Sequence, residues 1–389
     1  MKISLCIVVF SYVLYAGEAS AQSTRELRRL TPKPTTQTAE AAADLTWVQR
    51  LSGTSNTIAS VAFNGSRFVA AGAVRSLTSA DGVGWTVYSL PALISAVTSS
   101  SGNWVCVDES AGKIFTSPDG ANWTLRLTDN SNLAGFDIAY GNGIVVAVFN
   151  LGAIKTSQDN GVTWQIAGSP TGAAIRCVTH GEGIFLAIDV QNQVLRSTDG
   201  LTWSLTNMGA ANGYSFLGVT SAPGLFIAVG NSVIARSVDS GTTWTFQYPT
   251  GVALNKVGYR NGTFVAVGNV GAIRVSQDNG VSWQISNSGV TASLKGLVYG
   301  ANKWVAVGVN GVILTASDGG APALVPSLNI APAVCLEWQS QYGALYQVQS
   351  SLNQQTWQDI GPSLTGDGAI KRFYDPRSGT AGFYRVQIK

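Results

Sequence analysis

The sequence predicts an all-β fold: a seven-bladed β-propeller closed by its N-terminal strand and followed by a small C-terminal β-sandwich. Three observations support this prediction. A phrase of the form Ser-x-Asp-(x)-Gly-x-x-Trp recurs seven times, with its aspartates 38 to 40 residues apart. Short β-branched runs and glycine turns fill the intervals, without a helical period. A repeat of about 40 residues that contains four strands is typical of a propeller, in which each repeat forms one blade.

The recurring phrase, called the box below, is predicted to form the turn before the last strand of each blade. The box residues are the aspartates Asp81, Asp119, Asp159, Asp199, Asp239, Asp278 and Asp318, and the tryptophans Trp85, Trp123, Trp164, Trp203, Trp244 and Trp283. The seventh copy ends before its tryptophan. The aspartate can accept hydrogen bonds from turn N–H groups, the glycine tolerates a positive φ, and the tryptophan covers the hairpin. Seven copies round a ring cannot converge on one site, so we expect a structural role for all of them.

The repeat itself contains four strands. In the sixth copy we expect strands at 254–259, 263–268 and 272–276, and a fourth from Trp283. One tryptophan strand, around Trp47, precedes every three-strand core, whereas the last core (294–317) has no tryptophan strand after it. We therefore expect the strand at Trp47 to complete the seventh blade, which would close the ring and hide the sheet edges.

The two ends of the chain differ from the repeat. Residues 1–21 have the charged start, the apolar stretch and the Ala-x-Ala site of a secretory signal. We expect a disordered leader at 22–45, the propeller at 46–320, a linker at 321–326 and the β-sandwich module at 327–389. The apolar stretch is too short for a membrane-spanning helix. The sequence thus predicts an exported protein without a transmembrane segment.

Composition excludes several classes of site. Charged residues form 12% of the chain and the net charge is +3, so nucleic acid is not an expected partner. His180 is the single histidine, which excludes most zinc sites. Any Ser–His or Cys–His catalytic scheme would have to use His180. We expect this residue in a turn on the box side. Cys106, Cys177 and Cys335 are an odd set without CxxC spacing, so we expect buried free thiols. No metal or cofactor is predicted.

The box resembles the Asp-box, or BNR-type, repeat of sialidases, sortilin-like receptors and photosystem II assembly factors. The resemblance covers residues 47–320 and implies a propeller. The segment from Tyr346 to Gly361, with Phe383 to Val386, is similar to β-sandwich modules that end many exported proteins of Gram-negative bacteria. That similarity implies a secreted, periplasmic or cell-surface location in such a bacterium. Sialidases also carry a Phe/Tyr-Arg-x-Pro phrase early in the propeller, and Arg50, Arg67 and Arg75 lack the proline.

Six acidic residues of the predicted propeller lie outside the boxes: Asp108, Glu109, Asp129, Asp137, Glu182 and Asp189. All six fall in blades two to four, whereas blades five to seven carry six cations: Arg236, Lys256, Arg260, Arg274, Lys295 and Lys303. Four of the acids, which the repeat leaves unexplained, are expected on loops of the face opposite the boxes. The predicted ligand-binding patch contains Asp108, Glu109, Asp129, Asp189, Gln191 and Arg176, the last directed toward the channel mouth.

Three functions are consistent with these features. The first is a non-catalytic, monomeric scaffold that binds a protein or glycan outside the cytoplasm through the face opposite the boxes. The second is a glycoside hydrolase of sialidase-like architecture, which needs two carboxylates about 5–10 Å apart. The third is a structural envelope or matrix protein. Turnover of aryl-glycosides separates the first two, and glycan-array or envelope pull-down binding separates the first from the third.

Overall fold

The computed structural model describes residues 45–128, 133–209, 214–248 and 251–317, and the segments 334–339, 344–351, 355–360, 363–365, 370–375 and 383–388. The predicted signal peptide, the linker, Asp129 and Asp318 lie outside these residues. The chain divides into two compact units, one spanning Glu40–Ala321 and one that contains Pro322–Lys389. No helix in the described part is long and apolar enough to cross a membrane.

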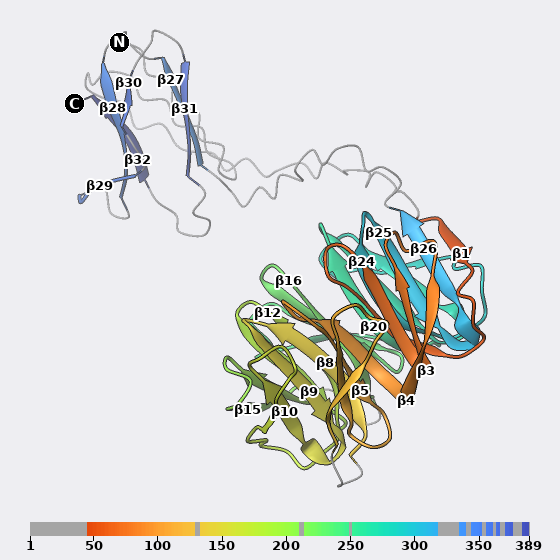
Figure 1. The fold of residues 1–389 in the computed structure, drawn as a ribbon. Helices are drawn as coiled ribbons and strands as arrows, with labels where there is room; N and C mark the ends of the chain where they lie inside the picture. Colours follow the sequence, from red (N-terminus) through yellow and green to blue (C-terminus); the bar gives the residue numbers. More distant parts are fainter. Residues whose placement is uncertain are drawn as a thin grey trace, which may run out of the picture. The chain divides into compact units, whose positions relative to one another are not determined.

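The first unit is a β-propeller built from antiparallel four-stranded meanders (Figure 1). Blades one and two form one continuous six-stranded sheet of β2 (Ile58–Phe63), β3 (Phe68–Ser79), β4 (Thr86–Ser99), β5 (Trp104–Asp108), β6 (Ile114–Ser117) and β7 (Thr124–Leu127). Blades three and four contain β8 (Gly135–Gly141), β9 (Ile144–Phe149), β10 (Ile154–Ser157), β11 (Gln165–Ile166), β12 (Ile175–Gly181), β13 (Ile184–Asp189), β14 (Gln193–Ser197) and β15 (Ser204–Asn207).

Blades five and six contain β16 (Phe216–Ala222), β17 (Leu225–Gly230), β18 (Val233–Ser237), β19 (Thr245–Gln247), β20 (Leu254–Arg260), β21 (Thr263–Gly268), β22 (Ile273–Ser276) and β23 (Gln284–Ser286). Blade seven contains β24 (Leu294–Gly300), β25 (Lys303–Gly308), β26 (Ile313–Ser317) and β1 (Trp47–Arg50). Short 3-10 turns join the second and third strands of blades three, six and seven: η1 (Asn150–Gly152), η2 (Asn269–Gly271) and η3 (Val309–Gly311).

Blades one and two share a sheet because β3 and β4 are long strands, and the two halves of each act as two successive strands. In β3, Phe68–Gly72 pairs with β2, whereas Arg75–Thr78 pairs with β4. Val74 lies between these halves and has a positive φ of 51°. The corresponding residue in the turn of blade five, Ser232, has a φ of 55°. The first half of β4 ends blade one and its second half, Ile94–Ser99, begins blade two. With this division the described residues 45–317 form seven blades, as the repeat predicts.

Closure of the ring by the N-terminal strand is confirmed. β1 pairs with β26, with Trp47 opposite Ala316 and Arg50 opposite Ile313. The Trp47 indole is buried, and its Nε1 donates to Ser286 Oγ of blade six at 3.2 Å. A strand from the start of the chain therefore covers the edge of β26 and anchors blade seven to blade six.

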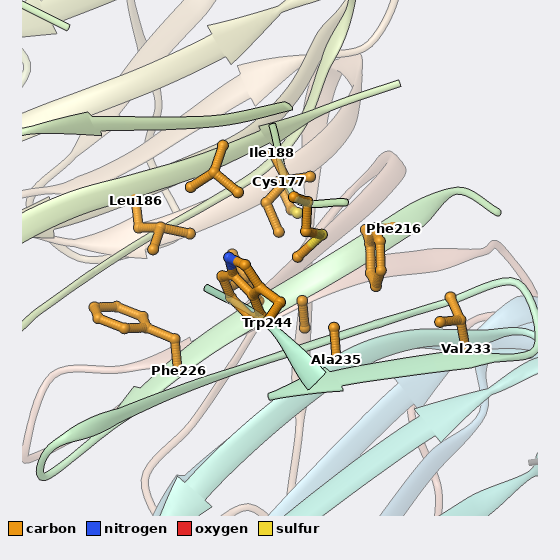
Figure 2. Close-up of a cluster of buried hydrophobic side chains, with 12 residues drawn as sticks. Cys177, Leu186, Ile188, Phe216, Phe226, Val233, Ala235 and Trp244 are labelled. Carbon is orange, nitrogen blue, oxygen red and sulfur yellow. The ribbon is translucent and has the colours of Figure 1, made fainter. Parts of the chain in front are cut away.

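The hydrophobic core lies between neighbouring blades. One cluster joins Leu186 and Ile188 of blade four to Phe226 and Ala235 of blade five, with Trp244 between them (Figure 2). The central strands are largely buried, and every residue of β5, β6 and β17 is buried. Burial on both faces explains why these strands read as continuous apolar runs.

The second unit contains two antiparallel sheets. β27 (Val334–Gln339) pairs with β31 (Ile370–Asp375), and β28 (Leu345–Ser351) pairs with β29 (Gln358–Asp359), β30 (Leu364–Thr365) and β32 (Phe383–Ile388). Tyr346 and Val348 of β28 are buried. Two antiparallel sheets, with buried aromatic and aliphatic side chains described for β28, agree with the predicted β-sandwich.

We expect loss of the closing strand to destabilise the propeller strongly. A chain that begins at residue 53 lacks β1, so β26 becomes an open edge and the Trp47 site between blades six and seven is left empty. Loss of the tryptophan side chain alone should cost about 3–5 kcal/mol. Thermal melting and light scattering, compared with a chain that begins at residue 45, check this; a monomer with an unchanged melting temperature would contradict closure.

Candidate functional site

The six described boxes share one hydrogen-bond arrangement, shown by the copy at 197–203. Ser197 Oγ accepts the Gly200 N–H at 2.8 Å and donates to Asp199 Oδ1 at 2.9 Å. Asp199 Oδ1 also accepts the N–H groups of Leu201 and Thr202, both at 2.8 Å. Trp203 Nε1 donates to the carbonyl of Gly200 at 3.1 Å. The serine hydroxyl, the aspartate Oδ1, the glycine N–H and carbonyl, and the indole N–H are thus all used within the turn.

Three boxes contain one extra residue, and the structure shows how it is accommodated. In these copies Asn160, Ser240 and Asn279 adopt positive φ values of 57–60° before the glycine. A hydroxyl four residues after the aspartate then donates to its second oxygen at 2.6 Å, from Thr163, Thr243 or Ser282. The serine, glycine and tryptophan contacts are kept. The two box lengths are therefore two solutions of the same turn.

Each box turn also packs against the blade before it. A Cβ placed on Gly120 would lie 2.3 Å from Val69 Cγ2 of blade one, and one on Gly241 would lie 2.4 Å from Leu186 Cδ1 of blade four. Both glycines also have a positive φ, of 77° and 78°. The box glycine is thus required twice, once by the turn and once by the contact between blades.

The predicted acidic patch is not an exposed cluster of free carboxylates. Asp108 is 3% exposed, and its carboxylate accepts the N–H of Ser110 and of Ala111. Asp189 is fully buried and accepts the N–H groups of Gln191 and Gln193, both at 2.9 Å, and the Thr171 hydroxyl at 2.9 Å. Each of these two aspartates caps the turn after a second strand, which is a local structural role that the repeat pattern does not indicate.

The other predicted members of the patch differ from these two aspartates in their exposure and contacts. Glu109 and Gln191 are exposed on the turns that these two aspartates hold. The Arg176 guanidinium stacks on the Phe136 ring, with 4.2 Å from Cζ to the ring centroid, and its Nε is buried without a hydrogen-bond partner in the described structure. Asp129 is outside the described residues. A binding role for these residues stays a prediction.

The concave site lies elsewhere, in the central channel. The first strand of each blade lines this channel, and each strand shifts register by one residue near its start. Directly after the shift comes the floor ring, one residue per blade: Ser60, Ala96, Asp137, Cys177, Gly218, Lys256 and Gly296. Three positions further along comes the mouth ring: Phe63, Ser99, Tyr140, His180, Ser221, Tyr259 and Tyr299.

A pocket of about 440 Å³ occupies the channel between these two rings. All seven first strands contribute to its lining. The mouth ring lies at the last or the second-last residue of each first strand, next to the turn to the second strand. In an antiparallel meander this turn lies on the same face as the box turn between the third and fourth strands, so the pocket opens on the box face. The predicted site was on the opposite face.

An ion pair crosses the channel at the floor of the pocket. Lys256 Nζ lies 2.9 Å from Asp137 Oδ1 and 2.8 Å from Oδ2. Asp137 Oδ2 also accepts the Val178 N–H at 3.2 Å. The Asp137 side chain is 5% exposed, whereas that of Lys256 is 27% exposed. Two residues 119 positions apart, in blades three and six, thus meet across the ring and form the base of the pocket.

His180 is part of this pocket rather than a turn residue. It lies in β12, its ring packs edge-on against Phe185 at 4.7 Å between centroids, and it covers Gly141 of blade three. Burial lowers the pKa of its imidazole, and its Nε2 has no hydrogen-bond partner in the described residues. At neutral pH the pocket wall therefore carries an uncharged imidazole. The two described thiols, Cys106 and Cys177, are buried and free as predicted, and burial raises the pKa of both.

Asp137, Lys256 and the mouth-ring aromatics were not identified from the sequence as a site. A signal was present, because Asp137 and Lys256 occupy the same position of the repeat, where the other blades have Ser, Ala, Cys or Gly. Two opposite charges at one level of a closed ring can meet across it. Finding them requires the strand register, which the bulge in each first strand shifts by one residue.

Comparison with known proteins shows the fold. No family model matches the chain, and no curated protein matches it in sequence. The solved structure "YCF48 bound to D1 peptide" has a TM-score of 0.59 at 19% identity, and covers 72% of this chain and 99% of that chain. YCF48 from Cyanidioschyzon merolae has a TM-score of 0.57 at 17% identity, with 71% and 99% covered. An inactive virginiamycin B lyase from Staphylococcus aureus, solved with quinupristin, has a TM-score of 0.63 at 14% identity, with 70% and 99% covered.

We expect Asp199→Ala to lower the free energy of unfolding by about 1 kcal/mol, because two turn N–H groups lose their acceptor on a solvated surface. Asp199→Asn keeps an acceptor oxygen and is the matched control. Urea denaturation of the two variants checks this difference. If Asp199→Ala unfolds at the same urea concentration as the parent, the box carboxylate has no structural role.

The same turns make stability depend on pH in the acid range. The N–H groups of Thr202 and Leu201 lower the pKa of Asp199 from 3.8 to about 2, and the Thr243 hydroxyl and N–H lower that of Asp239 to about 2. The stabilisation is fully present above the ordinary pKa, near 4, and is lost as the pH falls through about 2. Melting temperatures from pH 5 to 2 should therefore fall less steeply for Asp199→Asn than for the parent.

The ion pair should show strong coupling between its two residues. Lys256→Met leaves the buried Asp137 carboxylate unpaired and should cost about 2–3 kcal/mol, reduced from a fully buried pair because Lys256 is partly exposed. Adding Asp137→Asn removes the unpaired charge and should restore most of this loss. A double-mutant cycle in urea measures the coupling; additive single losses would show that the pair is not formed in solution.

Proposed function

We propose that this protein is an exported binding scaffold, which takes a peptide segment of a partner protein into the channel pocket on the box face. The pocket is the observation that carries the proposal. Its floor is closed by the Asp137–Lys256 pair, its walls come from all seven blades, and its volume of about 440 Å³ accommodates a few residues of peptide. A closed ring of blades holds such a site rigidly, so little conformational entropy is lost when a ligand binds.

The chemistry of the walls suits a peptide. Thr98, Thr179 and Thr220 offer hydroxyl groups along the pocket, and Tyr140 and Tyr259 offer aromatic surface at its mouth. Hydroxyls can pair with backbone amides, whereas aromatic rings cover the apolar parts of side chains. The D1 peptide in the YCF48 complex shows that a propeller of similar fold binds a peptide. Asp137 is the only carboxylate lining the described pocket, and Lys256 already pairs with it, so the pocket does not present the two carboxylates of a glycosidase.

The export part of the proposal rests on the sequence of residues 1–21. A charged start, a short apolar stretch and an Ala-Ser-Ala site are the features of a cleaved secretory signal. We place the mature protein outside the cytoplasm of a Gram-negative bacterium, in the periplasm, at the cell surface or in the medium. The mass of the mature protein, expected to begin at Gln22, checks cleavage.

Blocking the pocket should abolish peptide capture. Thr220 lines the pocket, so Thr220→Trp would fill it, whereas Thr124→Trp places the same side chain on exposed β7 of the outer rim and is the matched control. We expect peptides selected from a displayed random library on the parent to lose at least tenfold in affinity for Thr220→Trp and to bind Thr124→Trp normally, as measured by fluorescence anisotropy. Equal binding to both variants at unchanged melting temperature would refute the pocket as the binding site.

A further inference from the structure

We propose that the peptide enters the pocket with a carboxylate first and that Lys256 binds this carboxylate at the floor. This inference rests on the proposed function and specifies the chemical class of its ligand. It follows from an asymmetry within the ion pair and from the charges that surround it.

Asp137 has little capacity left for a ligand, because three of its roughly four lone-pair sites already accept hydrogen bonds. Its two oxygens accept both contacts from Lys256 Nζ, at 2.9 and 2.8 Å, and Oδ2 also accepts the Val178 N–H. The side chain is 5% exposed, so an incoming cation would meet a carboxylate that is both enclosed and neutralised. A ligand ammonium group therefore gains little at this floor.

Lys256 retains capacity. An ammonium group carries three N–H donors, and the two oxygens of Asp137 account for two of them. Its side chain is 27% exposed and lines the pocket. A carboxylate from the ligand can accept the third N–H, in a charge-assisted hydrogen bond inside a partly enclosed site where such bonds are stronger than in bulk water.

The mouth of the pocket carries a positive charge, as the floor does at Lys256. Arg260 lines it, four residues after Lys256 in β20, and its guanidinium lies over the Tyr299 ring at 5.2 Å from Cζ to the centroid. Four residues along a strand span about 13 Å, so one carboxylate reaches Arg260 before it reaches Lys256. Among the lining residues two cations stand against one carboxylate, which Lys256 already neutralises. The pocket therefore attracts an anion at its entrance and binds it at its floor.

The walls between the two cations can complete the site. Thr98 and Thr179 present hydroxyl donors from blades two and four, and the uncharged His180 has a buried Nε2 without a partner in the described part of the chain. A hydroxyl or an imidazole N–H can donate to a carboxylate oxygen that Lys256 does not use. The lining contains no second carboxylate that would repel the ligand.

The test uses the full protein and three dipeptide probes that share two alanines and differ in their end groups and charge. The probes are N-acetyl-Ala-Ala with a free carboxylate, the same peptide as an amide, and Ala-Ala-amide with a free ammonium group. Ligand-observed NMR titration should show the carboxylate probe binding roughly tenfold more tightly than the amide, which corresponds to about 1.4 kcal/mol. The ammonium probe should bind no better than the amide.

Two variants should then move the affinity in opposite directions. Asp137→Asn removes the competing negative charge but keeps an acceptor for the Val178 N–H, so it should tighten binding of the carboxylate probe roughly three- to tenfold. The double variant Asp137→Asn/Lys256→Met leaves no unpaired buried carboxylate, and it should reduce the carboxylate probe to the affinity of the amide. Lys295→Met changes a cation of the same first-strand set outside the pocket lining and should leave all three affinities unchanged. Melting temperatures confirm that each variant is folded.

The outcomes separate this inference from the function on which it rests. Tighter binding of the ammonium probe, or weaker carboxylate binding by Asp137→Asn, would overturn the carboxylate assignment. If the acid and the amide bind equally while Thr220→Trp still abolishes peptide capture, the carboxylate inference fails and the peptide site remains. If none of the probes binds and Thr220→Trp has no effect on capture, both proposals fail.

Discussion

The contact between each box turn and the preceding blade is the constraint on which the rest of this propeller depends. The box glycine adopts a positive φ and lies directly against a second-strand side chain of its neighbour, Val69 for Gly120 and Leu186 for Gly241. The glycine carbonyl accepts a hydrogen bond from the indole N–H of the box tryptophan, and the indole fills the space between the blades. One short turn therefore closes a hairpin and sets the distance to the next blade. Because this turn is repeated round the ring, it fixes the position of each blade relative to the next.

Further hydrogen bonds between blades reinforce the same contact. The Thr156 hydroxyl donates to the carbonyl of Gly200 at 2.6 Å, and Arg236 Nε donates to that of Asn279 at 2.8 Å. Both run from one blade to the box of the next. The ring is closed by the same kind of packing at its seam, where Trp47 lies between blades six and seven. Because every blade is positioned by its neighbour, an unpaired edge at one blade would weaken the adjoining contacts as well.

The channel chemistry is a consequence of this rigid ring. In the floor ring, Gly218 and Gly296 allow neighbouring first strands to approach closely; a Cβ on either would lie 2.9 Å from backbone atoms of the next blade. Asp137 and Lys256 are the charged members of that ring, and their contact closes the channel. The pair lies among the lining residues of the pocket, at the end away from the box face. Binding chemistry at such a site comes from side chains on rigid strands rather than from loops.

The sequence by itself determined the architecture. The spacing of Asp81 to Asp318 predicts the blades, and the tryptophan strand at Trp47 that precedes every core predicts the closure. The box residues are explained by hydrogen bonds within seven or eight consecutive residues. These features are local or periodic, so they can be recognised along the chain. Only the tertiary structure decided the site. The burial of Asp108 and Asp189 depends on loop conformation, and the meeting of Asp137 with Lys256 depends on ring closure and on a one-residue shift in each first strand. Composition places acids in one half of the ring and bases in the other, but only the closed ring determines which of them touch.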